Sequence, residues 1–292
     1  MEIATFTPSA VASWALPMEE IRLMPISDIQ FGSQDCDADR LKRHVDWGLE
    51  HDCHFVGLGD YCDRMSPSNR AAIRAARIYD SVSAAIQEKA EEDLAGLLKI
   101  LAPTAGKWLG LVSGHHFHDF EDGTTTDTRL ASALKTRYMG DGVALSLLKL
   151  THTIGKYKYH GYAKVWFTHG TGAGQKAAAP LNKLENVLTT FYADVYLMGH
   201  HHKKAATKIP FLTANIATKS GEIRWEARNR VLASTGGFLK GYVAGRRDHR
   251  GIPSGSYVEK GMMNPTALGG VIVYIRPRFT RGEVLVDVDV SL

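Results

Sequence analysis

Cysteine is scarce in this chain, which has only three, Cys36, Cys53 and Cys62, among 292 residues. No two of them form a Cys-x-x-Cys pair. A disulfide scaffold needs many more cysteines, and a thiolate zinc site needs them in closely spaced pairs. We therefore expect reduced thiols and a cytoplasmic protein.

Long hydrophobic runs are also absent, since no apolar stretch approaches the roughly 20 residues of a membrane-spanning helix. The first residues lack the basic segment and apolar core of a secretory signal. The 44% hydrophobic and 23% charged residues are typical of a globular protein. The formal net charge of +4 permits a polyanionic partner without requiring one. We expect no membrane partner.

The hydrophobic pattern of the chain predicts a mixed α/β fold that begins with a βαβ unit. The expected elements are strands at 21–27, 55–58, 107–112 and 195–198, helices at about 37–51, 66–101 (broken near 80–83) and 177–190, a hairpin over 143–167, and strands at 205–215, 222–234, 270–275 and 283–290. Residues 1–20 have no clear period and fit either a strand or a draped arm.

Five of the expected strands end in a carboxylate or a histidine. These strand ends carry Asp28, Asp60, Gly114-His115-His116, His169 and Gly199-His200-His201-His202. A single Gly-Asp pair such as Gly59-Asp60 is usually no more than a turn. Five such ends favour convergence, because open α/β sheets place ligands at the carboxyl ends of their strands. Carboxylate and imidazole ligands suit divalent transition metals, so the sequence predicts a dinuclear metal site.

Taken in order, these motifs resemble the pattern of the calcineurin-like metallophosphoesterases: Asp-x-His, Gly-Asp-x-x-Asp, Gly-Asn-His, a lone His, and Gly-His-x-His. The chain reads Asp28-x-Gln30, Gly59-Asp60-x-x-Asp63, Gly114-His115-His116, His169 and Gly199-His200-x-His202. The resemblance covers about residues 20–235. It implies a four-layer αββα sandwich, with residues 1–292 as one domain, a helical insertion at about 66–104 and a β-rich C-terminal half.

The resemblance also implies the site roles. Asp60 takes the position that bridges two divalent metal ions, and a hydroxide between the ions attacks phosphorus. His116 takes the position of the general acid that protonates the leaving oxygen. The remaining implied ligands are Asp28, Gln30 and His202 for one metal, and His115, His169 and His200 for the other.

Two of the implied metal ligands and one neighbouring residue depart from the family pattern. Gln30 replaces a histidine, and its amide oxygen is a harder ligand that favours Mn²⁺ or Mg²⁺ over Zn²⁺. We expect Mn²⁺, with Mg²⁺, Zn²⁺ and iron as alternatives. His115 replaces an asparagine, and a second register would make His115 the acid and align Gly114 with the asparagine. Phe117 stands where the family has an acidic residue, which leaves His116 without its usual neighbour.

Three arginines in the long helical segment, Arg70, Arg74 and Arg77, recur at spacings of four and three and therefore share one helix face. A solvated face is the plain interpretation of this pattern. The functional interpretation is a substrate-binding ridge beside the metals.

The resemblance predicts a phosphodiesterase that acts on nucleic acid or on a nucleotide diester. The stretch 236–270 and Gln30 resemble phage and prophage members, some of them grouped with DNA-repair nucleases, which would place the protein in a host cytoplasm. One alternative is a phosphomonoesterase or small-nucleotide phosphodiesterase. The other is a degenerate member that binds nucleic acid without cleaving it.

Overall fold

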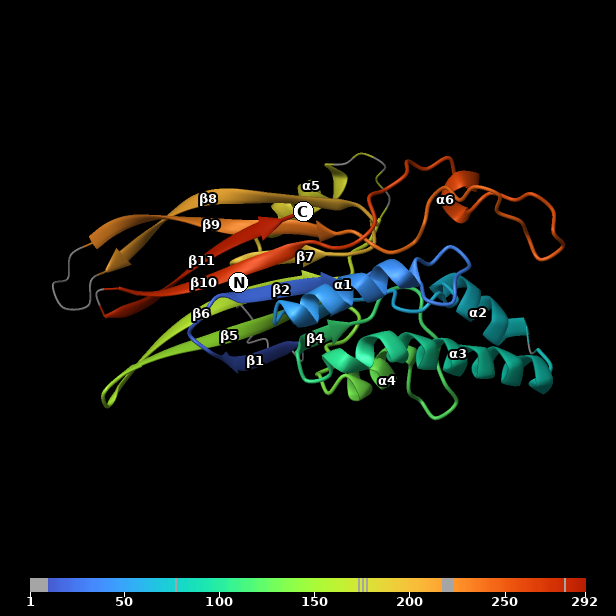
Figure 1. The fold of residues 1–292 in the computed structure, drawn as a ribbon, viewed down its shortest axis with the longest axis horizontal. Coiled ribbons are helices and arrows are strands. Elements are labelled where there is room, and N and C mark those ends of the chain that lie inside the picture. Colours follow the sequence, from blue (N-terminus) through green and yellow to red (C-terminus); the bar gives the residue numbers. More distant parts are fainter. Residues whose placement is uncertain are drawn as a thin grey trace, which may run out of the picture.

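Two β-sheets packed face to face form the centre of the molecule (Figure 1). The computed structural model describes residues 10–76, 78–172, 174, 176, 178–216, 223–280 and 282–292. In this part of the chain no helix is both long and apolar enough to cross a membrane.

The first sheet has five strands in the order β11-β10-β2-β3-β4. Its strands are β2 (Ile21–Ile26), β3 (His54–Leu58), β4 (Trp108–Val112), β10 (Ile272–Thr280) and β11 (Glu283–Ser291). The three strands β2, β3 and β4 run parallel, and β10 is antiparallel to β2 and β11. The parallel strands are nearly continuous apolar runs because both of their faces are covered.

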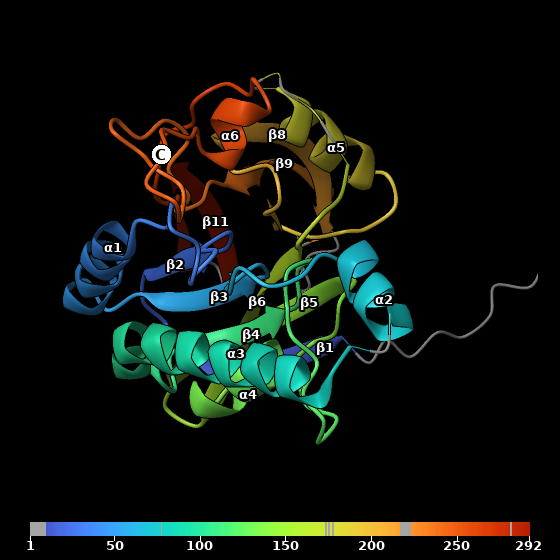
Figure 2. The same cartoon turned by 90° about the vertical axis from the view of Figure 1, so that its right-hand side faces the viewer.

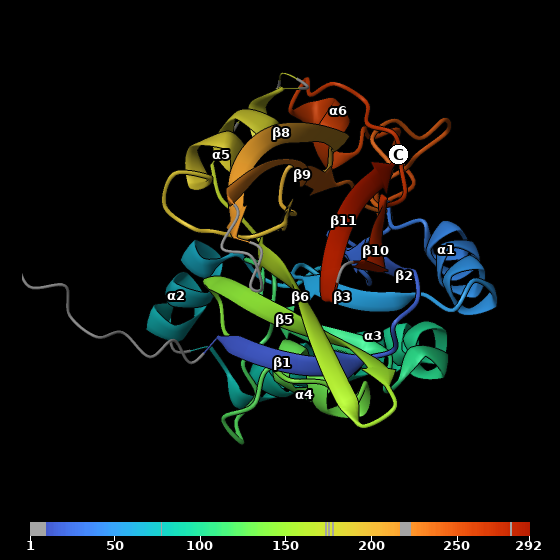
Figure 3. The ribbon, with the colours of Figure 1, turned by 90° about the vertical axis from the view of Figure 1, so that its left-hand side faces the viewer.

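The second sheet has six strands in the order β1-β5-β6-β7-β9-β8. Its strands are β1 (Val11–Leu16), β5 (Val143–Ile154), β6 (Tyr157–Thr168), β7 (Val195–Met198), β8 (Lys204–Ile216) and β9 (Ile223–Thr235). The predicted hairpin over 143–167 is confirmed, since β5 and β6 pair antiparallel. Figure 3 shows the left-hand side of the view in Figure 1, and there β11 of the first sheet packs against β6 of the second.

Helices cover the outer faces of both sheets (Figure 2). They are α1 (Ala38–Glu50), α2 (Pro67–Ala76), α3 (Asp80–Leu101) with the 3₁₀ turn η1 (Ala102–Thr104), α4 (Thr126–Ala133), α5 (Ala179–Val187) and the short α6 (Tyr257–Lys260). Asp37 caps α1, because its carboxylate accepts a hydrogen bond from the Arg40 amide at 3.1 Å.

Three apolar clusters account for the layers. The largest lies between the sheets and joins Leu23 and Val56 to Leu148 and Val165. The second packs α1, α3 and α4 against the outer face of the five-stranded sheet, and the third packs α5 against the six-stranded sheet. The predicted four-layer αββα arrangement is therefore confirmed. The single-domain organisation with an insertion at 66–104 stays a prediction.

Candidate metal centre

The predicted ligands lie at one edge of the molecule, where strands of both sheets end. Asp28 and Asp60 follow β2 and β3, and His115 follows β4, all from the five-stranded sheet. His169 and His200 follow β6 and β7 of the six-stranded sheet. The parallel runs β2-β3-β4 and β6-β7 explain the meeting, because parallel strands bring their carboxyl ends to the same edge.

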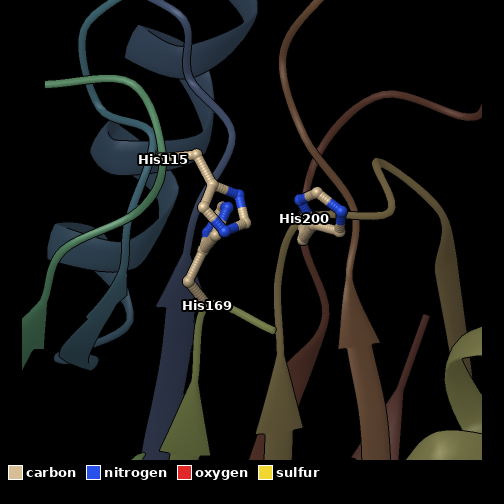
Figure 4. A group of neighbouring side chains, drawn as sticks. All are labelled: His115, His169 and His200. Carbon is tan, nitrogen blue, oxygen red and sulfur yellow. The ribbon is translucent and has the colours of Figure 1, made fainter. Parts of the chain in front are cut away.

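Three imidazoles form the first group of candidate ligands (Figure 4). One nitrogen each from His115, His169 and His200 lies within 4.8 Å of the other two. The ring centroids of His115 are 4.8 Å from His169 and 4.9 Å from His200. A set of nitrogen donors this close can coordinate one divalent transition metal.

Two carboxylates and a shared histidine form the second group. Ligand atoms of Asp28, Asp60 and His169 also lie within 4.8 Å of one another, and all three residues are buried. His202 adjoins this group, because its Nε2 lies 3.4 Å from Asp28 Oδ1. The two groups share His169, so two neighbouring ions fit the arrangement.

Orphaned atoms mark where such ions would bind. Asp28 Oδ1, Gln30 Oε1 and His169 Nε2 are buried without a hydrogen-bond partner, although buried polar atoms are nearly always paired. All three are ligand atoms for hard or intermediate divalent cations. The residues present therefore fit a divalent metal.

Hydrogen bonds to backbone carbonyls orient two of the histidines. His169 Nδ1 lies 2.7 Å from the Leu58 carbonyl and His200 Nε2 lies 3.0 Å from that of Gly172. A ring nitrogen that donates to a carbonyl leaves the opposite nitrogen with its lone pair free for a metal. Burial alone would lower the pKa of His169, but the Asp60 carboxylate, 3.4 Å from its Nε2, outweighs burial and raises that pKa to about 9.

Backbone amides hold the Asp60 carboxylate. Its Oδ1 accepts hydrogen bonds from the amides of His115 at 2.6 Å and His116 at 2.9 Å. Burial acts to raise the pKa of Asp60, but His169 and the His116 amide hold it well below its usual range. A Cβ at Gly114 would lie 2.0 Å from Asp60 Oδ1. Glycine is therefore required at residue 114 by this close approach.

The backbone at the site is strained. Eight non-glycine residues of the described chain have positive φ, and five of them belong to the site: Asp28, Gln30, Asp60, His200 and His202. Outside glycine such conformations are costly, and they persist where the surrounding structure imposes them, often at functional sites. The strain is independent support for a site built from these residues.

Gln30 lies beside Asp60, and its amide makes a specific contact. Its Nε2 donates a hydrogen bond to Asp60 Oδ2 at 3.0 Å, which leaves Oε1 buried and unpaired. The side chain therefore reaches the second ligand group, while its metal-binding role stays a prediction.

Replacing Gln30 by histidine tests that prediction. Histidine tolerates the positive φ of this position better than most residues. It would add an imidazole to the group, so we expect tighter metal binding and a shift of preference toward Zn²⁺. Titration of the metal-free variant and wild type with Mn²⁺ and Zn²⁺ measures this. Unchanged affinities in an unchanged order would place Gln30 outside the metal shell.

His116 does not belong to the imidazole group and has partners of its own. Its Nδ1 lies 2.7 Å from the Arg64 carbonyl and 3.9 Å from Asp63 Oδ1. The sequence reasoning missed this pairing of His116 with Asp63. Asp63 of the Gly-Asp-x-x-Asp loop supplies the acidic partner of His116 that Phe117 cannot supply. The second aspartate of that motif was the sequence feature that could have indicated it.

A buried carboxyl group, Asp127, lies behind the loop and was also missed. It is fully buried at the start of α4, and burial raises its pKa to about 7, helped by the charge of Asp60. Its environment includes the Ser113 hydroxyl and the Gly114 amide. It therefore supports the segment that leads to His115.

Arg70 does not extend from α2 as part of an exposed arginine ridge. The Arg70 side chain turns inward and hydrogen bonds to three backbone carbonyls of the site loops. For Arg74 the structure describes only the backbone, in α2, and Arg77 lies outside the described residues. A substrate-binding function for these two stays a prediction.

Comparison with known proteins adds little beyond this geometry. No protein-family model matches the chain, and no curated protein matches it. It is similar to the structure of a conserved uncharacterised protein from Streptococcus pneumoniae described as a predicted phosphoesterase, with 14% identity, a TM-score of 0.33, and 94% of this chain and 99% of that chain covered.

Two vacuolar protein sorting proteins are also similar. The zinc complex of Vps29 from Entamoeba histolytica has 10% identity and a TM-score of 0.35, covering 92% of this chain and 99% of that chain. Vacuolar Protein Sorting 29 from Cryptosporidium parvum has 13% identity and a TM-score of 0.32, covering 94% and 98%. Likenesses this distant carry no conclusion about activity, which therefore rests on the residues of this chain.

Proposed function

We propose that this protein is a metal-dependent phosphoesterase that hydrolyses phosphodiester bonds with two divalent ions. The observation that supports it is the pair of ligand groups that share His169, with a further histidine, His116, beside them. Two metal ions bound there would neutralise charge on the phosphoryl oxygens and lower the pKa of a bound water. Mn²⁺ is our candidate, because the second group, with Asp28 and Asp60, is rich in oxygen ligands.

His116 supplies the proton in this proposal. Its Nδ1 is engaged by the Arg64 carbonyl, which leaves Nε2 to carry a proton to the leaving oxygen. The side chain keeps 34% of its surface exposed, so a substrate oxygen can reach it. The amide of His116 also holds Asp60, which keeps the acid at a fixed place relative to the ligands.

We further propose that the substrate is a nucleic acid or a nucleotide diester. His116 and His202 keep 34% and 28% of their side chains exposed, which leaves this edge accessible to an extended chain. The positive net charge suits a polyanion. The resemblance of residues 236–270 to phage and prophage members points the same way and would place the protein in a host cytoplasm.

The test combines activity with metal content and salt dependence. We expect the Mn²⁺-loaded protein to hydrolyse bis-nitrophenyl phosphate and a single-stranded oligonucleotide, and to lose both activities on chelation. Oligonucleotide affinity should fall with salt at a slope of log affinity of about −0.7 per phosphate contacted.

Each part can fail separately. A flat salt response with retained diester hydrolysis would favour a small-nucleotide substrate. Metal binding and oligonucleotide binding without any turnover would support the degenerate, non-cleaving alternative, which the contact between Gln30 and Asp60 makes worth testing.

A further inference from the structure

The Arg70 guanidinium joins the two loops that carry Asp63 and His116. Its Nη1 lies 2.6 Å from the Met65 carbonyl, 2.9 Å from the His115 carbonyl and 3.1 Å from the Phe117 carbonyl, so its two N–H groups serve three acceptors and one N–H is shared. These acceptors belong to segments that follow β3 and β4, while Arg70 itself lies in α2. Only 11% of the side chain is exposed.

Two further contacts fix the plane of this group. The guanidinium carbon lies 3.8 Å from the centre of the Phe117 ring, a cation–π geometry, and Nε lies 3.7 Å from Asp119 Oδ2. Arginine suits this position because its planar group donates in several directions and stacks at the same time. A lysine carries one compact charge and can do only part of this.

The acceptors have a specific relation to His116. The carbonyls of His115 and Phe117 lie on either side of it in the chain. The carbonyl that holds its ring belongs to Arg64, the residue before Met65. One guanidinium therefore anchors the backbone at both ends of the hydrogen bond from His116 Nδ1 to the Arg64 carbonyl.

We infer that Arg70 is a positioning residue that sets the orientation of the His116 imidazole, rather than a substrate-binding residue. The inference rests on the proposed function, in which His116 is the general acid. Displacement of a reacting group by about 1 Å can cost 10²-fold in rate. Arg70→Ala should therefore lose roughly 10- to 100-fold on a diester with a poor leaving group.

Leaving-group dependence distinguishes positioning from general destabilisation. A nitrophenolate leaves without a proton, so Arg70→Ala should affect bis-nitrophenyl phosphate much less than an alkyl diester. Metal content should stay near that of wild type, because Arg70 holds His115 by its backbone carbonyl and leaves the imidazole that would bind metal to its own partners. Added guanidinium ion should restore part of the lost rate.

Arg129 provides the matched control. It stacks on Phe120 at 3.6 Å and pairs with Asp122 and Glu91, so it makes contacts of the same kind farther along the same loop. Arg129→Ala should leave the leaving-group ratio unchanged. Arg70→Lys keeps the charge and length, guards against a folding failure of the alanine variant, and should restore little of the lost rate.

Proton NMR of the metal-free protein tests the position of the His116 ring without an activity assay. An imidazole N–H that donates to a carbonyl gives a slowly exchanging proton signal far downfield. The His116 signal, assigned by its loss in His116→Ala, should weaken in Arg70→Ala and persist in Arg129→Ala.

The outcomes separate two failures. Wild-type protein that hydrolyses neither substrate overturns the proposed function. An active wild type with an Arg70→Ala variant that loses both substrates equally, or keeps the His116 signal, overturns the inference. A lost rate on both substrates together with lost metal would make Arg70 a structural residue only.

Discussion

Asp60→Asn should remove bound metal and phosphoesterase activity together. The second ligand group depends on the charge of Asp60, which lies 3.4 Å from His169 Nε2. Loss of a residue that only supports a ligand typically costs 10–100-fold in metal affinity, so loss of a bridging charge should cost more than about 100-fold. Metal analysis after gel filtration and the rate on bis-nitrophenyl phosphate measure the two effects.

Asparagine is suited to isolating the charge. It tolerates the positive φ at this position, and its amide oxygen can still accept from the amides of His115 and His116. Asp52→Asn is the matched control, because Asp52 also has positive φ but is paired with Lys107 at the surface. A variant of Asp60 that holds two metals and turns over normally would show that this residue is not the bridge.

His116→Ala should lose activity selectively on substrates with poor leaving groups. A ribose oxygen needs a proton as its bond breaks, whereas a nitrophenolate does not. General acid catalysis contributes about 10²–10⁴-fold, and the loss on a natural diester should be of that order. Metal content should remain near that of wild type, because the His116 ring lies with Asp63 and the Arg64 carbonyl.

His115→Ala is the comparison that makes this result decisive. His115 belongs to the imidazole group, so its loss should remove metal and reduce both rates alike. An exchange of the two phenotypes would show that the alignment at Gly114 is off by one residue. Equal losses on both substrates in His116→Ala would mean that the proton comes from another group.

The convergence of ligands was predictable from the sequence because it follows from strand direction. An apolar run ending in a carboxylate or a histidine fixes both the end of the strand and the edge to which it leads. His169 illustrates this, since its position after an expected strand predicted the shared edge, and the structure brings a ligand atom of His169 within 4.8 Å of one of Asp60.

Contacts between loops were not predictable in the same way. The spacing of Arg70, Arg74 and Arg77 indicates a shared helix face but not whether that face meets solvent or the site. The Arg70 side chain turns inward because it donates to the carbonyls of Met65 and His115, which lie in two loops far apart in the sequence. The pairing of His116 with Asp63 and the contact of Gln30 with Asp60 depend on tertiary geometry in the same way.

Helix boundaries were predicted to within about three residues, but the break expected near 80–83 precedes α3, which begins at Asp80. Thr125 caps α4 and forms a reciprocal pair of hydrogen bonds with Thr128. A run of Thr and Asp contains several competent caps, so local chemistry cannot choose among them. The choice leaves Asp127 inside the helix, where it is buried behind Ser113 and Gly114.

The division of the ligands between two sheets has a consequence for the order of folding. Asp28 and the His200 amide that bonds to it are separated by 172 residues of chain. Such a contact forms only after a long loop has closed, so it belongs late on the folding pathway. A metal ion that needs both sheets cannot nucleate folding. Such an ion would bind the folded native state, and it would prolong the lifetime of that state by slowing unfolding rather than by speeding folding.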